Sequence, residues 1–142
     1  MDASKLVKTL TDKDFTLGSV ESLTGGMFAS CMCGVPGASK VFRGSLVTYA
    51  TELKNRIAHV SLDTIKEYGV ISSECAFEMA QKGADVLDVD ICVSFTGNAG
   101  PSAMENKPVG TIFIGLSFKG EVETYDVKLS EDVLSDRNVT RE

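Results

Sequence analysis

The chain has 142 residues, of which 43% are hydrophobic and 24% are charged, and its formal net charge at pH 7 is −6. This length predicts a single domain over residues 1–142, which is large enough to fold around a hydrophobic core without disulfides. The negative charge argues against a general surface for nucleic acids or membranes.

Cysteine and histidine are too few and too scattered to predict a zinc site. His59 is the only histidine, and no CxxC pair occurs among the four cysteines, which stand in apolar stretches: Cys31, Cys33, Cys75 and Cys92. We therefore expect buried thiols in a reducing cytoplasm, with no metal and no cofactor. The first ten residues are too charged for a signal peptide, and no apolar run approaches the ~20 residues of a membrane span.

Apolar periodicity and turn residues predict alternating strands and helices. In chain order, the expected elements are a helix over 3–13, a strand over 15–20, a helix over 25–33, a strand over 41–49, a helix that begins within 50–56, a helix over 62–68, a helix capped by Ser72 or Ser73, strands over 90–95, 109–118 and 121–129, and the start of a helix within 130–142. This alternation favours the α/β class with a substantially parallel sheet. The last two strands are joined by the short turn Lys119-Gly120 and must pair antiparallel, so we expect a mixed sheet.

Three polar residues stand at or just past the ends of predicted strands, namely Ser22, Tyr49 and Thr96. In open α/β sheets ligands bind outside the carboxyl ends of the strands, so these side chains could converge on one pocket. Ser22 stands in a strand-to-helix turn, where the backbone N–H groups of a helix start can hold an anion or an oxyanion. These residues also have a purely structural interpretation, since a serine at the start of a helix is often an N-cap. The same holds for Lys54, in the helix expected within 50–56, which could be a solvated helix lysine.

Six segments occur together and in order along the chain: Glu21-Ser22-Leu23-Thr24-Gly25-Gly26, Val35-Pro36-Gly37-Ala38-Ser39, Val47-Thr48-Tyr49 with Lys54, Gly69-Val70-Ile71-Ser72, Thr96-Gly97-Asn98-Ala99-Gly100-Pro101 and Lys107-Pro108-Val109-Gly110-Thr111. This set resembles the CinA-type family, which is the C-terminal domain of competence/damage-inducible proteins and is also found as a stand-alone nicotinamide mononucleotide amidohydrolase. The resemblance extends from about Leu6 to Arg141. Each motif alone is weak, but six in register are specific.

The resemblance implies a three-layer α/β/α fold with a mixed, mostly parallel sheet. It also implies hydrolysis of the carboxamide of nicotinamide mononucleotide to nicotinate mononucleotide and ammonia, without a metal. Ser22 matches the family's nucleophile and Lys54 its basic partner. Polar pocket residues are matched by Tyr49 and Thr96, a C-terminal arginine is matched by Arg137, and Arg141 lies one turn further on.

This chemistry requires an activated nucleophile, because a primary amide is unreactive. Lys54 must be desolvated so that its pKa falls and it can take the proton of Ser22. We expect backbone N–H groups around Thr24, Gly25 and Gly26 to hold the oxyanion, and Lys54, with Tyr49, to help protonate the departing ammonia. The backbone of Thr96-Gly97 and an arginine are expected to hold the 5′-phosphate of the nucleotide.

Two other functions stay open, a non-catalytic nucleotide-sensing or partner-binding module and an amidohydrolase acting on another small amide. The intact Ser22 and Lys54 favour an enzyme. The segment Ser102-Ala103-Met104-Glu105-Asn106 replaces a loop that is usually rich in glycine in the family, and family members usually continue their C-terminal helix beyond the position of Glu142. The family tends to self-associate, so we expect a homo-oligomer that binds a small nucleotide and neither nucleic acid nor membrane.

Overall fold

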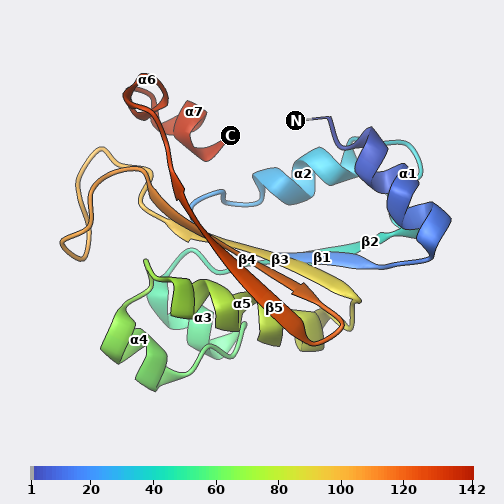
Figure 1. Cartoon of the computed structure of the whole chain (residues 1–142), viewed down its shortest axis with the longest axis horizontal. Coiled ribbons are helices and arrows are strands. Elements are labelled where there is room, and N and C mark those ends of the chain that lie inside the picture. Colours follow the sequence, from blue (N-terminus) through green and yellow to red (C-terminus); the bar gives the residue numbers. More distant parts are fainter. Residues whose placement is uncertain (1) are drawn as a thin grey trace.

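The computed structural model describes residues 2–142, and its centre is a five-stranded sheet with the strand order β2-β1-β3-β4-β5 (Figure 1). The strands are β1 (Leu17–Glu21), β2 (Phe42–Val47), β3 (Ile91–Gly97), β4 (Thr111–Phe118) and β5 (Glu121–Lys128). β1 pairs in parallel with β2 and with β3, whereas β4 pairs antiparallel with both β3 and β5. Only β4 runs against the other described strands, which confirms the expected mixed sheet.

Helices cover both faces of the sheet (Figure 1). One face carries α1 (Ser4–Lys13) and α2 (Met27–Cys33), with α6 (Glu131–Leu134) and α7 (Arg137–Arg141) above its other end. The opposite face carries α3 (Thr51–Arg56), α4 (Leu62–Tyr68) and α5 (Ser73–Leu87), and η1 (Ala38–Lys40) is a short 3-10 turn before β2. The predicted three-layer α/β/α fold is thus confirmed.

Side-chain alternation along the central strands supplies a hydrophobic cluster on each face of the sheet. Val20 and Cys92 point to the α5 face, where they join Met79 and Ile71 in one cluster, whereas Leu17 joins a second cluster with α1 and α2 on the other face. Gly83 lets α5 lie close to β1, because a Cβ at this position would overlap the side chain of Val20.

The differences from the sequence-based elements are confined mainly to the ends of elements. Gly25 and Gly26 were expected in a helix, but they lie in the preceding turn with φ angles of 60° and 98°. The single helix expected over 130–142 is instead two short helices separated by Ser135 and Asp136. The strand expected to reach residue 49 ends at Val47. Backbone hydrogen bonds set these boundaries, and side-chain periodicity does not report them.

The thiols follow the expectation only in part. Cys75 and Cys92 are buried, and burial raises the pKa of each thiol to about 12. Cys33, in contrast, is exposed on the last turn of α2, and Cys31 is partly exposed. The apolar surroundings of Cys33 in the sequence were therefore a wrong guide to its burial.

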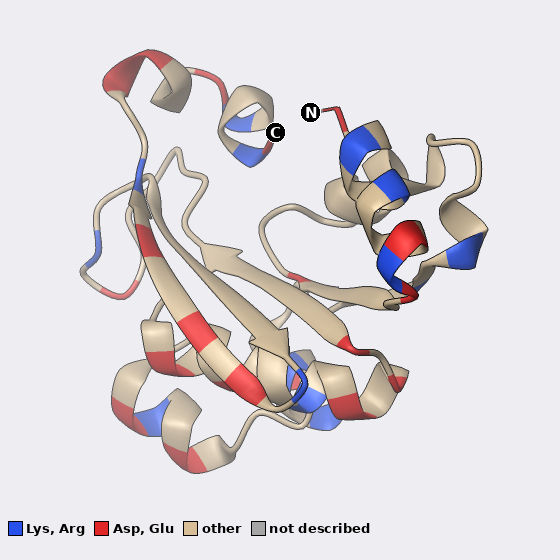
Figure 2. Cartoon of the chain, turned by 45° about the vertical axis from the view of Figure 1, so that its right-hand side comes forward, with Lys and Arg blue, Asp and Glu red and all other residues tan. Residues whose placement is uncertain are grey.

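Acidic and basic side chains are unevenly distributed over the fold (Figure 2). β5 forms one edge of the sheet and exposes Glu121, Glu123 and Asp126, whereas α7 carries two arginines. No helix among residues 2–142 is both long enough and apolar enough to span a membrane.

Candidate functional site

The ends of β1, β2 and β3 bring together segments that are far apart in the sequence. Glu21, the last residue of β1, pairs with Val47 of β2 on one side and with Phe95 of β3 on the other. Because all three strands are parallel, the residues that follow them emerge at the same edge of the sheet. The turn after Glu21, the residues between β2 and α3, and the loop after β3 therefore form the candidate site.

Ser22 and Lys54 form a buried pair at this edge. The Nζ atom of Lys54 lies 2.9 Å from the Oγ atom of Ser22, and Lys54 is 1% exposed. Nζ also donates to the backbone oxygens of Thr48, at 2.7 Å, and Tyr49, at 3.3 Å. No carboxylate within residues 2–142 forms an ion pair with Lys54. The amine thus sits among neutral oxygens, away from water.

This environment favours the neutral form of the amine. Burial lowers the pKa of Lys54 below its usual 10.5, and electrostatic interactions with the Cys75 sulfur and with the carboxylates of Glu105 and Glu52 counteract part of that effect. A neutral amine has two N–H groups and one lone pair. Two backbone oxygens are present for the N–H groups, and the Ser22 hydroxyl is positioned to donate to the lone pair. The geometry therefore suits a serine nucleophile with a lysine base.

Glu21 fixes the turn that carries Ser22. Its carboxylate is fully buried and occupies the N-terminus of α2, where backbone amides donate to it. The carboxylate accepts from the amides of Gly26 (3.2 Å), Phe28 (3.0 Å) and Ala29 (3.1 Å), and from the hydroxyls of Ser19 (3.2 Å) and Ser45 (3.1 Å). Glu21 is the last residue of β1 and therefore reaches the N-terminus of α2 from the strand.

This arrangement changes the expected oxyanion donors. The amide of Gly26 donates to Glu21, and the amide of Gly25 donates to the backbone oxygen of Ser22 at 3.0 Å. Neither is available for an oxyanion, contrary to the expectation. Within residues 2–142, the amides of Leu23 and Thr24 have no acceptor. They are the donors that remain next to Ser22.

Replacing Glu21 with alanine should lower the free energy of unfolding by at least about 3 kcal/mol, because three amides and two hydroxyls lose a buried, charged acceptor. Urea unfolding would measure the change. Glu74→Ala is a matched control, since Glu74 is an exposed acid in the first turn of α5. A loss for Glu21→Ala no larger than that of the control would contradict the assigned role.

The other expected pocket residues lie at the same edge but already have protein partners. Tyr49 contacts Lys54 only through its backbone oxygen, and its exposed hydroxyl accepts from Arg137 at 2.7 Å. The hydroxyl of Thr96 is buried and donates to the backbone oxygen of Val70 at 2.6 Å. Gly97 packs against β4 so closely that a Cβ would lie 2.6 Å from the backbone oxygen of Thr111.

Two arginines of α7 connect the C-terminal segment to this edge. Arg137 donates to the backbone oxygen of Gly100 and to the hydroxyl of Tyr49. Arg141 donates through Nε to the backbone oxygen of Leu23, at 2.8 Å, and through Nη2 to that of Thr24, at 3.2 Å. Arg141 thereby holds the Ser22 turn from outside.

Sequence reasoning missed three buried polar atoms at the same edge. Among residues 2–142, the Oγ1 atoms of Thr24 and Thr48 and the Nδ2 atom of Asn98 have no hydrogen-bond partner. They follow β1, β2 and β3 respectively. Buried polar groups are rarely left unpaired, and exceptions concentrate at sites with a role beyond folding. Their positions directly after strands were the only signal of them in the sequence.

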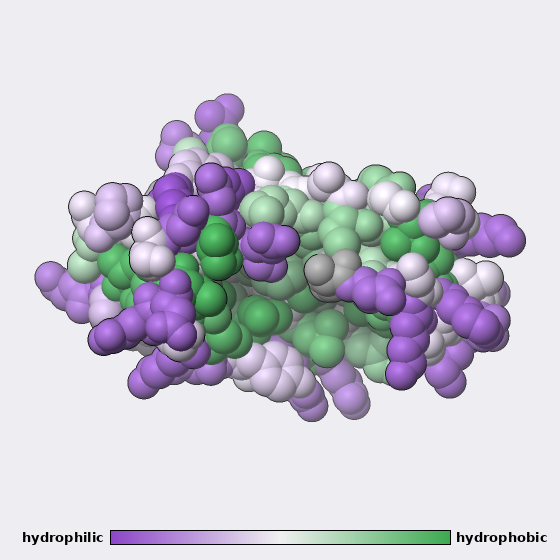
Figure 3. Space-filling view, turned by 90° about the horizontal axis from the view of Figure 1, so that it is seen from above, coloured by the Kyte–Doolittle hydropathy of each residue, from purple (hydrophilic) through white to green (hydrophobic). Residues whose placement is uncertain are grey.

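An apolar hollow of about 490 Å³ adjoins the Ser22 turn on the α2 face, and Figure 3 shows hydrophobic side chains in its middle. Leu23, Thr24 and Arg141 form its end nearest to Ser22, and Phe28 and Phe95 contribute to its wall.

Among the described residues no cluster of histidine, cysteine, aspartate and glutamate side chains could hold a metal ion.

Comparison with known proteins identifies the family. The CinA C-terminal domain matches residues 2–141, nearly the whole chain. The chain belongs to the CinA C-terminal domain family. The resemblance inferred from six short motifs is thereby confirmed. A competence-damage inducible protein of Listeria innocua is 47% identical over 124 residues, and one of Limosilactobacillus fermentum is 43% identical over 128 residues. These matches cover 87% and 89% of this chain but 30% and 31% of the relatives, so the chain spans less than a third of their length.

Solved CinA superfamily structures have the same fold. A protein from Escherichia coli superimposes with a TM-score of 0.90 at 29% identity, covering 98% of this chain and 82% of that one. A competence damage-inducible protein A from Klebsiella pneumoniae gives a TM-score of 0.91 at 25% identity, covering 98% of this chain and 85% of that one.

Proposed function

We propose that this CinA-type chain hydrolyses the carboxamide of nicotinamide mononucleotide, with Ser22 as the nucleophile and Lys54 as the base. The observation that carries the proposal is the buried contact of 2.9 Å between Lys54 Nζ and Ser22 Oγ. Burying a lysine among neutral oxygens is unfavourable for folding, and such a residue is typical of a site where a neutral amine is needed.

In the proposed reaction the Ser22 oxygen attacks the carboxamide carbon while its proton passes to Lys54. The amides of Leu23 and Thr24 stabilise the oxyanion, in place of the expected glycine amides. Lys54 then returns the proton to the nitrogen as the C–N bond breaks, and ammonia leaves. Water attacks the resulting ester, again with Lys54 as base, which releases the carboxylate product and restores Ser22.

The arginines support recognition of the phosphate of the nucleotide. Arg137 and Arg141 concentrate positive charge beside the Ser22 turn of a chain with a net charge of −6. Both guanidinium groups also contact backbone oxygens, so an incoming phosphate would have to share or replace these partners. We further propose that the chain acts in the cytoplasm and forms a homo-oligomer. Light scattering of the purified chain would test the oligomer by its mass.

The function is tested by measuring ammonia release from nicotinamide mononucleotide, nicotinamide and nicotinamide riboside. Fastest turnover of the mononucleotide supports the proposal and the role of the phosphate. Faster turnover of an unphosphorylated amide would favour an amidohydrolase of another small amide. If no ammonia is released but the mononucleotide raises the melting temperature, the non-catalytic nucleotide-sensing function is favoured.

A further inference from the structure

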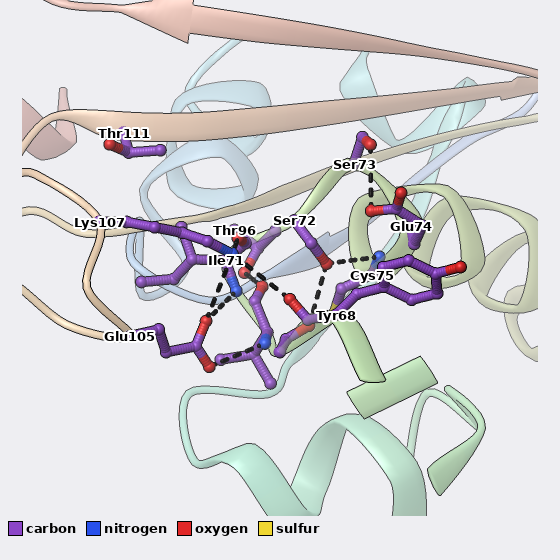
Figure 4. A network of polar contacts seen from close by, with 12 residues as sticks. Tyr68, Ile71, Ser72, Ser73, Glu74, Cys75, Thr96, Glu105, Lys107 and Thr111 are labelled. Carbon is purple, nitrogen blue, oxygen red and sulfur yellow. Dashed lines mark hydrogen bonds and ion pairs between the residues drawn. The ribbon is translucent and has the colours of Figure 1, made fainter. Parts of the chain in front are cut away.

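The segment 102–106, which departs from the glycine-rich pattern of the family, and Lys107 directly after it are attached to residues 68–71 by two charged side chains, Glu105 and Lys107 (Figure 4). The Glu105 carboxylate accepts from the amides of Val70, at 3.0 Å, and Ile71, at 2.9 Å. Lys107 Nζ donates to the backbone oxygens of Tyr68, at 3.3 Å, and Ile71. Glu105 and Lys107 also form an ion pair of 3.8 Å. We call this set of contacts the latch.

The backbone around the latch is adapted to it. Glu105 and Asn106 have φ angles of 53° and 58°, a left-handed conformation that is unfavourable for a residue such as glutamate. Strained residues of this kind persist where the surrounding contacts fix them, and they occur often at functional sites. Gly69 has a φ of 76°, and a Cβ there would lie 2.5 Å from the Glu105 carboxylate. Only a glycine at position 69 leaves room for the carboxylate.

The latch continues into the candidate site. Val70, whose amide is held by Glu105, accepts the hydrogen bond from the buried Thr96 hydroxyl at the end of β3. Ile71 and Cys75, next along the chain, belong to the buried cluster that backs this edge of the sheet. Displacing residues 70 and 71 would therefore disturb Thr96 and the packing around it.

The charge of Glu105 also acts on Lys54. Lys54 Nζ contacts only the neutral oxygens of Ser22, Thr48 and Tyr49 among the described residues. The thiol of Cys75 on α5 and two carboxylates, Glu105 in the latch and Glu52 on its own helix, act on the pKa of Lys54 without touching it. Lys107 partly neutralises Glu105 through their ion pair. Both carboxylates favour the charged form of Lys54 and so oppose the effect of burial.

We propose that Glu105 and Lys107 are positioning residues for the Ser22–Lys54 pair, holding residues 68–71 and thereby Thr96 in place while Glu105 sets part of the charge around Lys54. This inference rests on the proposed amidase function. It gives the non-glycine segment 102–106 a role, because Glu105 in this segment fixes the amides of Val70 and Ile71.

Three variants separate the two parts of the proposal. Glu105→Gln removes both the charge and part of the latch, Lys107→Met removes the latch contacts of the amine, and Glu52→Gln removes a carboxylate near Lys54 without touching the latch. Hydrogen exchange of the Val70 and Ile71 amides reports the latch without any need for activity. The pH profile of kcat/KM for nicotinamide mononucleotide reports Lys54.

In Glu105→Gln and Lys107→Met we expect about tenfold faster exchange of the two amides and about tenfold lower kcat on the high-pH plateau. In Glu52→Gln we expect the exchange rates and this kcat to be unchanged. Removing a carboxylate lowers the pKa of Lys54, so the rising limb of the profile should move to lower pH in Glu105→Gln and Glu52→Gln. It should not do so in Lys107→Met. Asp12→Asn, on the exposed Lys8–Asp12 pair of α1, should change none of these quantities.

Unchanged amide exchange in Glu105→Gln would overturn the latch. Faster amide exchange, with an unchanged kcat and an unmoved rising limb of the pH profile, would show that the latch is only a structural contact. That result would overturn the proposed role of the latch at the Ser22–Lys54 pair. If the wild-type chain has no amidase activity, the proposed function fails separately. Amide exchange in Glu105→Gln and Lys107→Met then still decides the latch. The Lys54 titration, followed by NMR of its ¹³Cε atom, decides the effect of the Glu105 charge, which is supported by a lower pKa in Glu105→Gln and overturned by an equal one.

Discussion

Substitution of Ser22 by alanine should reduce kcat for ammonia release from nicotinamide mononucleotide by at least about 10³-fold, because no other described hydroxyl contacts Lys54 Nζ. The fold should persist, since removal of one oxygen leaves the rest of the turn held by Glu21 and Arg141. Hydroxylamine added during turnover should trap the acyl group as a hydroxamate with the wild-type chain and not with the variant.

Ser39→Ala is the matched control for this variant, since Ser39 is exposed in η1 and remote in sequence from every site segment. Circular dichroism of both variants would verify that they are folded. Retention of more than a tenth of the wild-type rate by Ser22→Ala would refute a serine nucleophile, although not the activity itself.

Substitution of Lys54 by methionine should reduce kcat by a similar factor and remove the pH dependence that the amine confers. Since burial lowers the pKa of Lys54, the wild-type rate should rise with pH and level off before pH 10.5, the usual pKa of a lysine. Lys66→Met is the control, because Lys66 is an exposed lysine on α4. A rate within tenfold of the wild type in Lys54→Met would exclude this base.

Lys54→Met should also change how the free energy of unfolding depends on pH. Between the lowered pKa of the folded state and 10.5 in the unfolded state, the unfolded chain binds more protons, so the wild-type free energy of unfolding gains a contribution that rises with pH. Lys54→Met lacks this contribution. The buried thiols, whose raised pKa values act in the opposite direction, are present in both proteins. Urea unfolding from pH 7 to 10 should therefore show a wild-type-minus-variant difference that increases with pH, and a constant difference would contradict the assigned pKa.

The fold was largely predictable because patterns among neighbouring residues determine where most of its strands and helices lie. The apolar run before Ser22 and the turn at Lys119-Gly120 placed β1 and the β4–β5 hairpin, since alternation and turn residues act over a few positions. Boundaries at Gly25 and within 130–142 were less predictable, because their hydrogen bonds involve partners elsewhere in the chain. The exposure of Cys33 depends likewise on which face of α2 the sheet covers.

The candidate site was predictable only where short motifs carry it. The juxtaposition of Ser22 and Lys54 followed from the family resemblance, and the structure places the two atoms within hydrogen-bonding distance. The partners of Glu21 and Glu105 could not be derived, because the amides they accept from are set by tertiary packing. Glu105 lies 34 and 35 positions from its two amides. No spacing rule in a single sequence links residues so far apart.

The acidic edge strand β5 has a consequence for the behaviour of this chain at high concentration. An uncovered sheet edge can recruit the edge of another molecule and start a growing ribbon of strands. Glu121, Glu123 and Asp126 would bring three exposed carboxylates close to those of an incoming β5, and like charges on neighbouring strands repel. Neutralising these carboxylates by lowering the pH would remove that protection, so the onset of turbidity on acidification reports how well this edge resists self-templated aggregation.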